Sequence, residues 1–375
     1  MKIAFLDSWM QSNAEGSGTA VSISGLAQAL AHQGHQVTRV APLKHWPHNL
    51  TLRRLLFNIQ LPMLLRRVHY DLIVGFDIDG FLWSSQERTV PYVVFVKGVI
   101  AEELQHEWGR TRLLFRMLAQ LEGYNARGAD LVLTDSMYGR QAIQRHYGVP
   151  FERISLSAPG IDLAYWRHVS ERLPYTTDEH TILCIARQYP RKHIADLIRA
   201  IPIVQQRIPQ VRVVIVGDGP EHLALRRLAT DLHLDGVVCF TGSVSDEYVA
   251  AAYRSADVFC LPSVQENFGI VFAEAMANRL PIVATTAAAI PEVVPDRVAG
   301  YLVPPGDVAA IAHALVTLLN NPEQRYTFGE NGYQRAQQFN WNHTADLFLE
   351  QVTWLLHKDY HVGSEGGYQP GFEGH

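Results

Sequence analysis

Two carboxylates in one short stretch are the first candidates for ligand chemistry. Glu266 lies in the loop after the apolar run 257–261, and Glu274 lies about a turn and a half into the helix-forming residues that follow. Such a corner is where open parallel sheets bind ligands, and the first helix amides, near Phe268 and Gly269, would point outward without partners. One carboxylate for a sugar, free amides for a diphosphate and a second carboxylate for a ribose would form a nucleotide-sugar site. The competing interpretation is that both glutamates are solvated helix charges.

Two cations form a second candidate group. Arg187 and Lys192 lie five apart at a predicted junction between a strand and a helix, and Pro190 shapes the turn between them. Arginine can grip two oxygens in a fork and lysine offers a compact charge, so the two together suit a diphosphate. Either one alone would more often be a surface charge. Gly217-Asp218-Gly219-Pro220 and Phe240-Thr241-Gly242 follow later strands, and the motifs together predict one binding edge of one sheet.

Two loops in the first half of the chain carry weaker signals. Residues 13–19 lie between a predicted strand and helix, and Gly16 and Gly18 would let backbone N–H groups approach a phosphate closely. A tight turn is the competing explanation. Asp77 and Asp79 follow another strand and could hold a divalent ion against a diphosphate, or face an acceptor instead. Because the second half offers the diphosphate a better site, we expect no metal ion there.

An alternation of strands and helices must position these residues, and it predicts two α/β halves. The strands expected in the first half are 2–7, 36–41, 72–76, 92–96, 131–134 and 154–157, and those in the second are 181–186, 211–216, 237–242, 258–261, 281–285 and 300–303. Helices are expected at 20–32, 194–204, 311–320 and 342–356. The polar stretch 167–180 is the expected linker, and the Gly- and Pro-rich end, 359–375, is expected to be disordered.

Length and composition describe a globular protein of two domains. A chain of 375 residues is too long for one ordinary core, and 47% hydrophobic with 18% charged residues excludes a disordered chain. Cys184, Cys239 and Cys260 lie inside apolar runs, which argues against disulfides and a zinc site. Asp7 ends the apolar N-terminal run too early for a signal peptide, and no segment has the length of a membrane span. We therefore expect a cytoplasmic protein with no nucleic-acid partner.

Residues 50–68 raise the question of a membrane contact. The pairs Arg53-Arg54 and Arg66-Arg67 lie among leucines, with Pro62 between them. One interpretation is an amphipathic helix at the inner face of a membrane. The other is an ordinary pair of helices, interrupted at Pro62, whose arginines extend along apolar surface to solvent. The first half of the chain is slightly basic although the net charge is −5, which suits an anionic surface without deciding between the two.

The order and spacing of the motifs resemble the retaining GT-B glycosyltransferases of family 4, also called glycosyl transferases group 1. The resemblance covers nearly the whole chain and rests on Gly16-Ser17-Gly18, Pro159-Gly160-Ile161-Asp162, Arg187 with Lys192, Gly217-Asp218-Gly219-Pro220, Phe240-Thr241-Gly242, Pro262-Ser263, Glu266-Asn267-Phe268-Gly269, Glu274, Pro291-Glu292-Val293-Val294 and Gly300-Tyr301-Leu302-Val303-Pro304-Pro305-Gly306-Asp307. It implies two Rossmann-like, doubly wound parallel-sheet domains facing across a cleft. Residues 1–168, joined by a helix at about 341–358, would bind the acceptor, and residues 169–340 the nucleotide sugar.

The resemblance also implies roles for individual residues. Arg187, Lys192 and Glu266 would be the catalytic residues: Arg187 and Lys192 would hold the donor phosphates, and Glu266 the sugar hydroxyls. Glu274 would hold the ribose. The other implied donor-binding residues are Gly16, Gly18, Gly217, Asn267, Phe268, Gly269 and Ile270. Lys97 stands where many members have a histidine near the sugar, and Lys97 and Asp77 are therefore assigned to the sugar or acceptor side. Ala288-Ala289-Ile290 stand where the family often has two glycines.

The implied activity is retaining, metal-independent transfer of a hexose-type sugar from a UDP-, GDP- or ADP-sugar to a hydroxyl of a glycolipid, polysaccharide or small glycoside. The nucleotide sugar is a substrate, and no other cofactor is implied. The leaving diphosphate itself would take the proton of the acceptor, so we assign no protein base. Two alternatives are a nucleotide-sugar epimerase of related fold and a nucleotide-sugar-binding protein without catalysis. The residues specify neither the donor base, the acceptor nor the oligomeric state.

Overall fold

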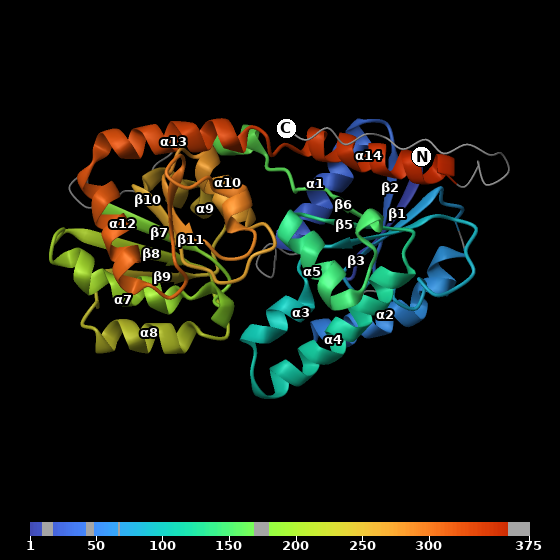
Figure 1. Cartoon of the computed structure of the whole chain (residues 1–375), viewed down its shortest axis with the longest axis horizontal. Coiled ribbons are helices and arrows are strands. Elements are labelled where there is room, and N and C mark those ends of the chain that lie inside the picture. The colour runs from blue at the N-terminus through green and yellow to red at the C-terminus, as the bar shows by residue number, and fades with distance from the viewer. Residues whose placement is uncertain (10–17, 43–48, 67, 169–179, 359–375) are drawn as a thin grey trace.

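Two α/β domains lie side by side along the long axis of the molecule (Figure 1). The computed structural model describes residues 1–9, 18–42, 49–66, 68–168 and 180–358. One sheet has the strand order β2-β1-β3-β4-β5-β6 and the other has the order β12-β11-β10-β7-β8-β9. Neighbouring strands pair in parallel throughout both sheets. This confirms the predicted pair of doubly wound parallel sheets.

Every predicted strand exists, and no bound differs from its prediction by more than one residue. The strands of the first domain are β1 Lys2–Leu6, β2 Gln36–Val40, β3 Leu72–Phe76, β4 Tyr92–Val96, β5 Leu131–Thr134 and β6 Ile154–Leu156. Those of the second are β7 His180–Ile185, β8 Val211–Val216, β9 Val238–Gly242, β10 Val258–Leu261, β11 Ile282–Thr285 and β12 Gly300–Val303.

Helices cover both faces of each sheet. Those before β7 are α1 Gly18–His32, α2 Leu50–Leu65, α3 Ile100–Glu103, α4 Gly109–Gly128, α5 Met137–Tyr147 and α6 Leu163–His168. Those after β7 are α7 Ile194–Gln205, α8 His222–Asp231, α9 Asp246–Ser255, α10 Ile270–Ala277, α11 Ile290–Val293, α12 Val308–Asn320, α13 Pro322–Ala336 and α14 Trp341–Lys358. The pattern did not predict α13, whose apolar stripe is interrupted by Gly329 and Gly332 on the face packed against α10 and Arg279.

The first sheet separates two hydrophobic cores because side chains alternate along each strand. In β1, Ala4 and Leu6 face the core covered by α2 and α5, whereas Ile3 and Phe5 face the core covered by α1 and α14. Phe348 of α14 lies in the second of these cores, with its ring 6.5 Å from that of Phe5. The last helix therefore packs on the first sheet, although it follows the second domain in sequence (Figure 1).

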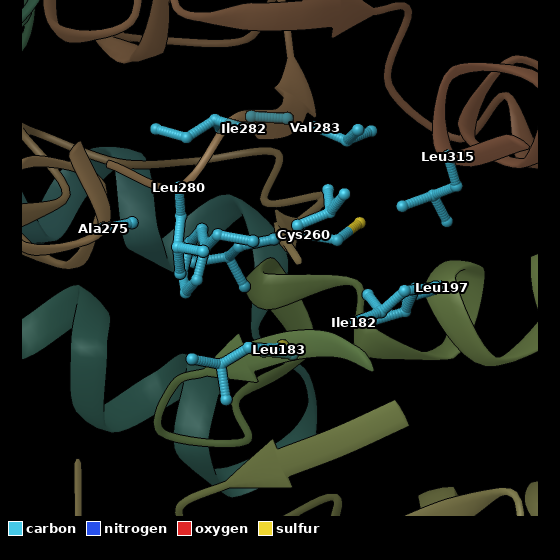
Figure 2. Packing of buried hydrophobic residues seen from close by; sticks show 14 of the residues in the cluster. Ile182, Leu183, Leu197, Cys260, Ala275, Leu280, Ile282, Val283 and Leu315 are labelled. Carbon is cyan, nitrogen blue, oxygen red and sulfur yellow. The ribbon is translucent and has the colours of Figure 1, made fainter. Parts of the chain in front are cut away.

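The second domain has one continuous core. Ile182 of β7 lies toward Leu197 and Leu315, from α7 and α12, whereas its neighbour Leu183 lies on the other face of the sheet (Figure 2). Cys260 is fully buried in this core, as the sequence predicted, and the three cysteines are free thiols. The apolar strand interiors fix the sheet, which leaves the polar residues at the strand ends to form a site.

The prediction of two helices interrupted at Pro62 was wrong, because α2 is continuous. Pro62 falls in the last turn, where it removes a single backbone hydrogen bond, and Phe57, Leu61 and Leu65 anchor the helix to the sheet on one buried stripe. The expectation that its arginines reach solvent also fails for Arg54, which is buried. No helix among the described residues combines the length and apolar character that crossing a bilayer requires. The predicted disorder of 359–375 lies outside the described residues.

Candidate functional site

A cavity of about 360 Å³ lies where the two domains meet. The first domain contributes Lys97, Glu103 and Asp135, which lie at the ends of β4 and β5 and in α3. The second contributes the segments that follow β7, β8 and β10. The candidate residues from the sequence that line the cavity are Gly18, Lys97, Arg187, Lys192, Gly217, Glu266, Asn267, Phe268, Gly269 and Ile270.

Glu266 and Lys192 form a direct ion pair at the cavity. The Lys192 Nζ lies 2.5 Å from the Glu266 Oε1, and the Ser263 hydroxyl donates to the same oxygen at 2.9 Å. Glu266 is only 7% exposed, so its charge needs such a partner when no ligand is bound. The sequence suggested separate tasks for these residues, whereas the structure joins them. A ligand that binds here exchanges part of this pairing for its own polar groups.

Arg187 differs from Lys192 because its guanidinium is exposed and makes no ion pair among the described residues. It lies just beyond β7, with its Cζ 5.9 Å from the centre of the Tyr189 ring. Gly217, at the end of β8, approaches this loop so closely that a Cβ would lie 2.2 Å from the Ala186 carbonyl oxygen, and its φ is +112°. Only glycine fits there, so the backbone after β8 packs directly against the loop that carries Arg187.

The start of α10 leaves backbone amides facing the cavity. Gly269 precedes the helix with φ +79°, and no side chain caps the first amides. The Phe268 ring is buried against Phe339, with the ring centres 5.1 Å apart, so Phe268 can offer a ligand only its backbone. Uncapped amides at a helix start attract an anion through both hydrogen bonds and the helix dipole. Ile270 lies at the same end of the helix and lines the cavity.

Glu274 does not line the cavity, although it lies one turn beyond Ile270 on the same side of α10. The Tyr253 hydroxyl donates to its Oε2 at 3.0 Å. Burial raises the pKa of Glu274 to about 7, against the opposing effect of the Tyr253 hydrogen bond. This carboxyl group therefore titrates near neutral pH before any ligand arrives.

The glycine loop is only partly described. Gly16 lies outside the described residues, and Gly18 is the first residue of α1. A Cβ on Gly18 would lie 3.5 Å from the Ile270 Cγ2, which is an ordinary contact. The starts of α1 and α10, one from each domain, therefore lie close together at the cavity.

Lys97 pairs with an aspartate that the sequence analysis missed. Its Nζ lies 2.6 Å from the Asp135 Oδ1 and 3.7 Å from the centre of the Phe95 ring. Burial raises the pKa of Asp135 to about 6, although the Lys97 charge acts in the opposite direction. Asp135 directly follows β5, at the same sheet edge as the other candidates, and that position was the available signal. The pair gives the first-domain wall of the cavity one cation and one carboxylate.

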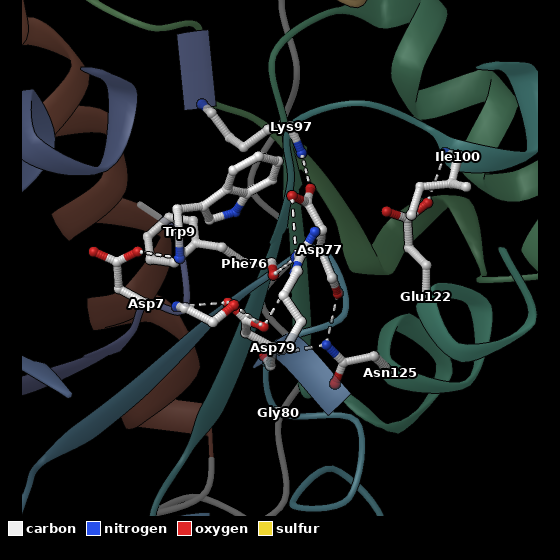
Figure 3. A network of polar contacts seen from close by, with 12 residues as sticks. Asp7, Trp9, Phe76, Asp77, Asp79, Gly80, Lys97, Ile100, Glu122 and Asn125 are labelled. Atoms are coloured by element: carbon white, nitrogen blue, oxygen red, sulfur yellow. Dashed lines mark hydrogen bonds and ion pairs between the residues drawn. The ribbon is translucent and has the colours of Figure 1, made fainter. Parts of the chain in front are cut away.

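Asp77 and Asp79 are internal partners of other residues and do not line the cavity (Figure 3). The Arg54 Nη2 lies 3.6 Å from the Asp77 Oδ2, and its Nε lies 3.4 Å from the Asp79 Oδ1. The Lys97 backbone N–H donates to the Asp77 Oδ1 at 2.9 Å, and Ser8 donates to Asp79 through its N–H and its hydroxyl. Burial raises the pKa of both carboxyl groups.

These contacts argue against the two other interpretations of the Asp77 and Asp79 pair. The carboxylates have 4% and 0% exposure, so neither a metal ion nor an acceptor can reach them from the cavity. No group of three His, Cys, Asp or Glu side chains suited to a metal ion occurs within the described ranges. Asp77 instead positions Lys97, by accepting a hydrogen bond from its backbone N–H.

Asn267 extends from the second domain into the first. Its Nδ2 donates to the Lys97 carbonyl oxygen at 3.1 Å and to the Thr134 hydroxyl at 3.2 Å. A Cβ on Gly139 would lie 2.3 Å from the Asn267 Oδ1, so the two surfaces fit closely. The Asn267 side chain therefore contacts the first domain, whereas the sequence predicted that it would hold the donor.

Two further contacts join the domains around the cavity. The Glu292 carboxylate accepts hydrogen bonds from the Met137 and Tyr138 amides, at 2.7 and 2.8 Å, and so caps the start of α5 from the other domain. Arg191 and Glu103 form an ion pair at 3.1 Å. These contacts hold the two domains together beside the cavity. A small rotation of one domain against the other would break them.

Two protein-family models match adjacent parts of the chain. The model described as Glycosyltransferase Family 4 matches residues 16–165, and the model described as Glycosyl transferases group 1 matches residues 169–335. The two matches thus divide between the two domains, and together they cover most of the chain.

The chain resembles curated proteins over about half of their length. The chain is 30% identical over 244 residues to a D-inositol 3-phosphate glycosyltransferase of Corynebacterium kroppenstedtii. The matched region covers 60% of this chain and 54% of that protein. It is 41% identical over 173 residues to a phosphatidyl-myo-inositol mannosyltransferase of Mycobacterium leprae, which covers 45% of each. The chain therefore spans about half the length of the curated relatives it matches.

Solved structures resemble nearly the whole chain. Sucrose-phosphate synthase from Thermosynechococcus elongatus superimposes with a TM-score of 0.77 at 25% identity, over 96% of this chain and 99% of that one. Anabaena HepE in complex with UDP-glucose superimposes with a TM-score of 0.71 at 22% identity, over 94% and 100%. Both show the same two-domain fold.

Proposed function

We propose, from the premise that the chain belongs to glycosyltransferase family 4, that it transfers a hexose-type sugar from a nucleoside-diphosphate sugar to an acceptor hydroxyl. The transfer retains the anomeric configuration and needs no metal ion. One observation carries the proposal: the exposed Arg187, the Lys192–Glu266 pair and the uncapped start of α10 converge on one cavity. Cations and free amides together suit a diphosphate, and a carboxylate beside them suits sugar hydroxyls.

The chemistry follows from where charge develops. Breaking the bond between the anomeric carbon and the diphosphate leaves positive charge on the sugar and extra negative charge on the leaving group. Arg187, Lys192 and the amides of α10 stabilise that negative charge, and one such donor is typically worth about 3 to 4 kcal/mol in a site without water. The acceptor hydroxyl attacks from the side of the leaving group, and a diphosphate oxygen takes its proton.

The Lys192–Glu266 pair gives the donor site a switchable arrangement. Without ligand, Lys192 neutralises a carboxylate that is nearly buried. When the diphosphate binds, Lys192 turns part of its charge toward phosphate oxygens, and the sugar hydroxyls take over as partners of Glu266. Charge compensation is thereby kept before and after binding.

Relatives and folds support the donor class more closely than the acceptor. HepE is seen with UDP-glucose, and two relatives are named for inositol phosphate and phosphatidylinositol acceptors. We propose a hydroxyl-rich acceptor, presented at the first-domain wall of the cavity near Lys97 and Asp135. We propose that the protein acts in the cytoplasm, at the inner face of a membrane.

A panel of UDP-, GDP- and ADP-sugars tests the proposal. The protein should slowly release the nucleoside diphosphate from one of them in EDTA, with the sugar product in its original anomeric form. Arg187→Ala should slow this release by about 100- to 1,000-fold, whereas Arg226→Ala, which removes an exposed arginine of α8, should not. Binding without turnover would indicate a non-catalytic binding protein, and a change of the sugar on intact donor would indicate an epimerase.

A further inference from the structure

The Asn267 side chain forms hydrogen bonds with the first domain, although its backbone belongs to the second. Its Nδ2 donates to the Lys97 carbonyl oxygen at 3.1 Å and to the Thr134 hydroxyl at 3.2 Å, and the Ser136 hydroxyl donates to its Oδ1 at 3.4 Å. Thr134 already donates to the Val96 carbonyl oxygen, so its own oxygen can only accept from Asn267. Both acceptors therefore require the amide nitrogen, which fixes the orientation of the side chain.

These hydrogen bonds are buried, unlike those of Glu292 at the same interface. Asn267 is 6% exposed and Thr134 is fully buried, whereas the bonds of Glu292 to α5 lie at an exposed edge. Water can replace a lost partner at an exposed contact, but a buried polar group that loses its partner pays the full cost of desolvation. Separating the domains at Asn267 therefore costs more than separating them at Glu292.

The neighbours of Asn267 in the chain are fixed within the second domain. Glu266 pairs with Lys192, and the Phe268 ring packs against Phe339. The loop that contains these three neighbouring residues, 262–269, joins β10 to α10 and lines the cavity. The Asn267 backbone therefore moves with the carboxylate of the candidate donor site, and its side chain transmits that movement to the first domain.

Lys97 receives the contact in the first domain. Its backbone N–H donates to Asp77 at 2.9 Å (Figure 3), and its carbonyl oxygen accepts from Asn267. Asp77 holds the Lys97 backbone from within the first domain, and Asn267 holds it from the second. Because the backbone is held from both sides, the Lys97 side chain is directed to Asp135, where the two form the ion pair at the cavity wall.

We propose that Asn267 is a positioning residue, which holds Lys97 in place for the reaction when the loop 262–269 packs against the first domain. The acceptor side of the cavity is thereby coupled to the donor side through one amide group. This inference rests on the proposed function. Loss of the amide should slow turnover, whereas binding of the free nucleotide, which depends on Arg187 and Lys192, should stay the same.

Asn267→Ala tests the positioning role with a donor alone. The measurement is release of nucleoside diphosphate, in EDTA, from the sugar that the UDP-, GDP- and ADP-sugar panel identifies. The variant loses two neutral hydrogen bonds, which together are worth about 30-fold, and kcat should fall by about that factor. Calorimetry with the free nucleoside diphosphate should give a Kd within about twofold of the unmodified value, which also shows that the variant is folded.

N267D adds a pH readout that a general loss of packing does not produce. An ionised carboxylate offers no donor to the Lys97 carbonyl oxygen, whereas a protonated carboxyl group offers one. One regained hydrogen bond is worth about fivefold, so kcat of N267D relative to that of N267A should rise about fivefold as the pH falls from 8 to 5.5. The nearby charges of Lys97, Asp135, Lys192 and Glu266 are present in both variants, so their titration cancels in this ratio.

A double-mutant cycle shows whether Asn267 acts through Lys97. In the K97M background there is no ammonium group left to position, so N267A should lower kcat by less than about threefold. The full 30-fold loss in that background would overturn the proposal, because Asn267 would then act on some other group.

N331D is the matched control. The Asn331 Nδ2 donates to the Val298 carbonyl oxygen at 3.1 Å, the same distance as at Lys97, but within the second domain. N331D should keep the unmodified kcat at every pH. The proposal is overturned if N267A keeps full kcat, if N267A weakens nucleotide binding as much as it slows turnover, or if N267D and N267A have parallel pH profiles.

Small-angle X-ray scattering separates this inference from the proposed function. Scattering needs no turnover, and N267A should have a larger radius of gyration than the unmodified protein or N331D, because its domains are held less closely. An unmodified protein that turns over no donor contradicts the proposed function. An unchanged radius of gyration in N267A contradicts the role of Asn267 in holding the domains, whether or not the protein turns over a donor.

Discussion

Two charged clusters, one in each domain, use their residues in opposite ways. In the second domain, Arg187 is exposed without an ion pair and Lys192 lies at the cavity wall beside Glu266. In the first domain, Arg54 and its aspartates are buried against one another, with 6% exposure or less. Charges that face a cavity are free to meet a ligand, whereas charges that face each other hold backbone segments together. Substitutions in these two clusters should therefore affect different properties.

The largest effect is expected for Arg54→Met, which should destabilise the fold. The substitution leaves Asp77 and Asp79 buried without a cation, and breaking a buried ion pair from one side costs about 3 to 5 kcal/mol. Denaturant unfolding measures the loss. Arg53→Met is the matched control on the same helix, because the Arg53 guanidinium has no ion-pair partner among the described residues. Equal losses in both variants would mean that general packing of α2 explains the effect.

Arg187→Ala should have the next largest effect, on rate and not on stability. The side chain is exposed, so unfolding should change little. Its charge acts on a leaving group whose negative charge grows toward the transition state, and loss of such a group typically lowers kcat by about 100- to 1,000-fold. Steady-state kinetics with the preferred donor separate the effect on kcat from the effect on KM. A rise in KM with unchanged kcat would show that Arg187 only binds the ground state.

Glu274 predicts a smaller, pH-dependent effect. Its pKa is about 7, so the carboxyl group is mostly protonated below pH 7. If ribose hydroxyls donate to the carboxylate, only the ionised form binds well, and donor affinity should rise about tenfold per pH unit up to pH 7 and then level off. Calorimetry with the nucleotide sugar from pH 5.5 to 8.5 measures this. Glu274→Gln should flatten the profile, and a slope retained in that variant would assign the titration elsewhere.

The same raised pKa has a defined consequence for stability. The folded protein keeps the Glu274 proton up to about pH 7, whereas the unfolded chain releases it near the ordinary value of a glutamate. The contribution of this group is therefore fully present below the unfolded pKa and is lost as the pH rises toward 7. Bound donor should remove this loss, because it gives the ionised carboxylate new partners.

The sequence predicted the strands and the fold well because those depend on local patterns. Apolar runs such as 131–134 bury on both faces of a parallel sheet, and residues directly beyond them fall on the binding edge. Arg187, Lys192 and Glu266 could be brought together from sequence for that reason. The direct ion pair between Lys192 and Glu266 could not be predicted, because it depends on how far their two loops approach each other.

The first domain was harder to predict because its polar contacts join distant segments. Arg54 lies in α2, its aspartates follow β3, and Ser8 follows β1, so no short motif contains the network. Helix amphipathicity alone made Arg54 resemble a surface residue. Asn267 shows the same limit at the domain interface, where its partners Lys97 and Thr134 lie more than a hundred residues away in sequence.

The smallest effect is expected where the two domains touch, at Glu292. Its carboxylate receives the Met137 and Tyr138 amides across the interface, and it does not line the cavity. Glu292→Gln removes the charge at the start of α5, which is worth about 0.3 to 1 kcal/mol at an exposed helix end. That cost falls only on the closed arrangement of the domains. We expect kcat/KM for the acceptor to fall about two- to fivefold while affinity for the free nucleoside diphosphate stays unchanged.

Glu323→Gln is the matched control for this last prediction. Glu323 is an exposed acid in the first turn of α13, within the second domain, so it gives the same helix-end charge without contact to the first domain. Its substitution should leave acceptor kinetics unchanged. An equal fall in both variants would trace the effect to the stability of the second domain. A loss of nucleotide affinity in Glu292→Gln would instead place Glu292 in the donor site. Residues that bind the ligand could then no longer be distinguished from residues that only join the two domains.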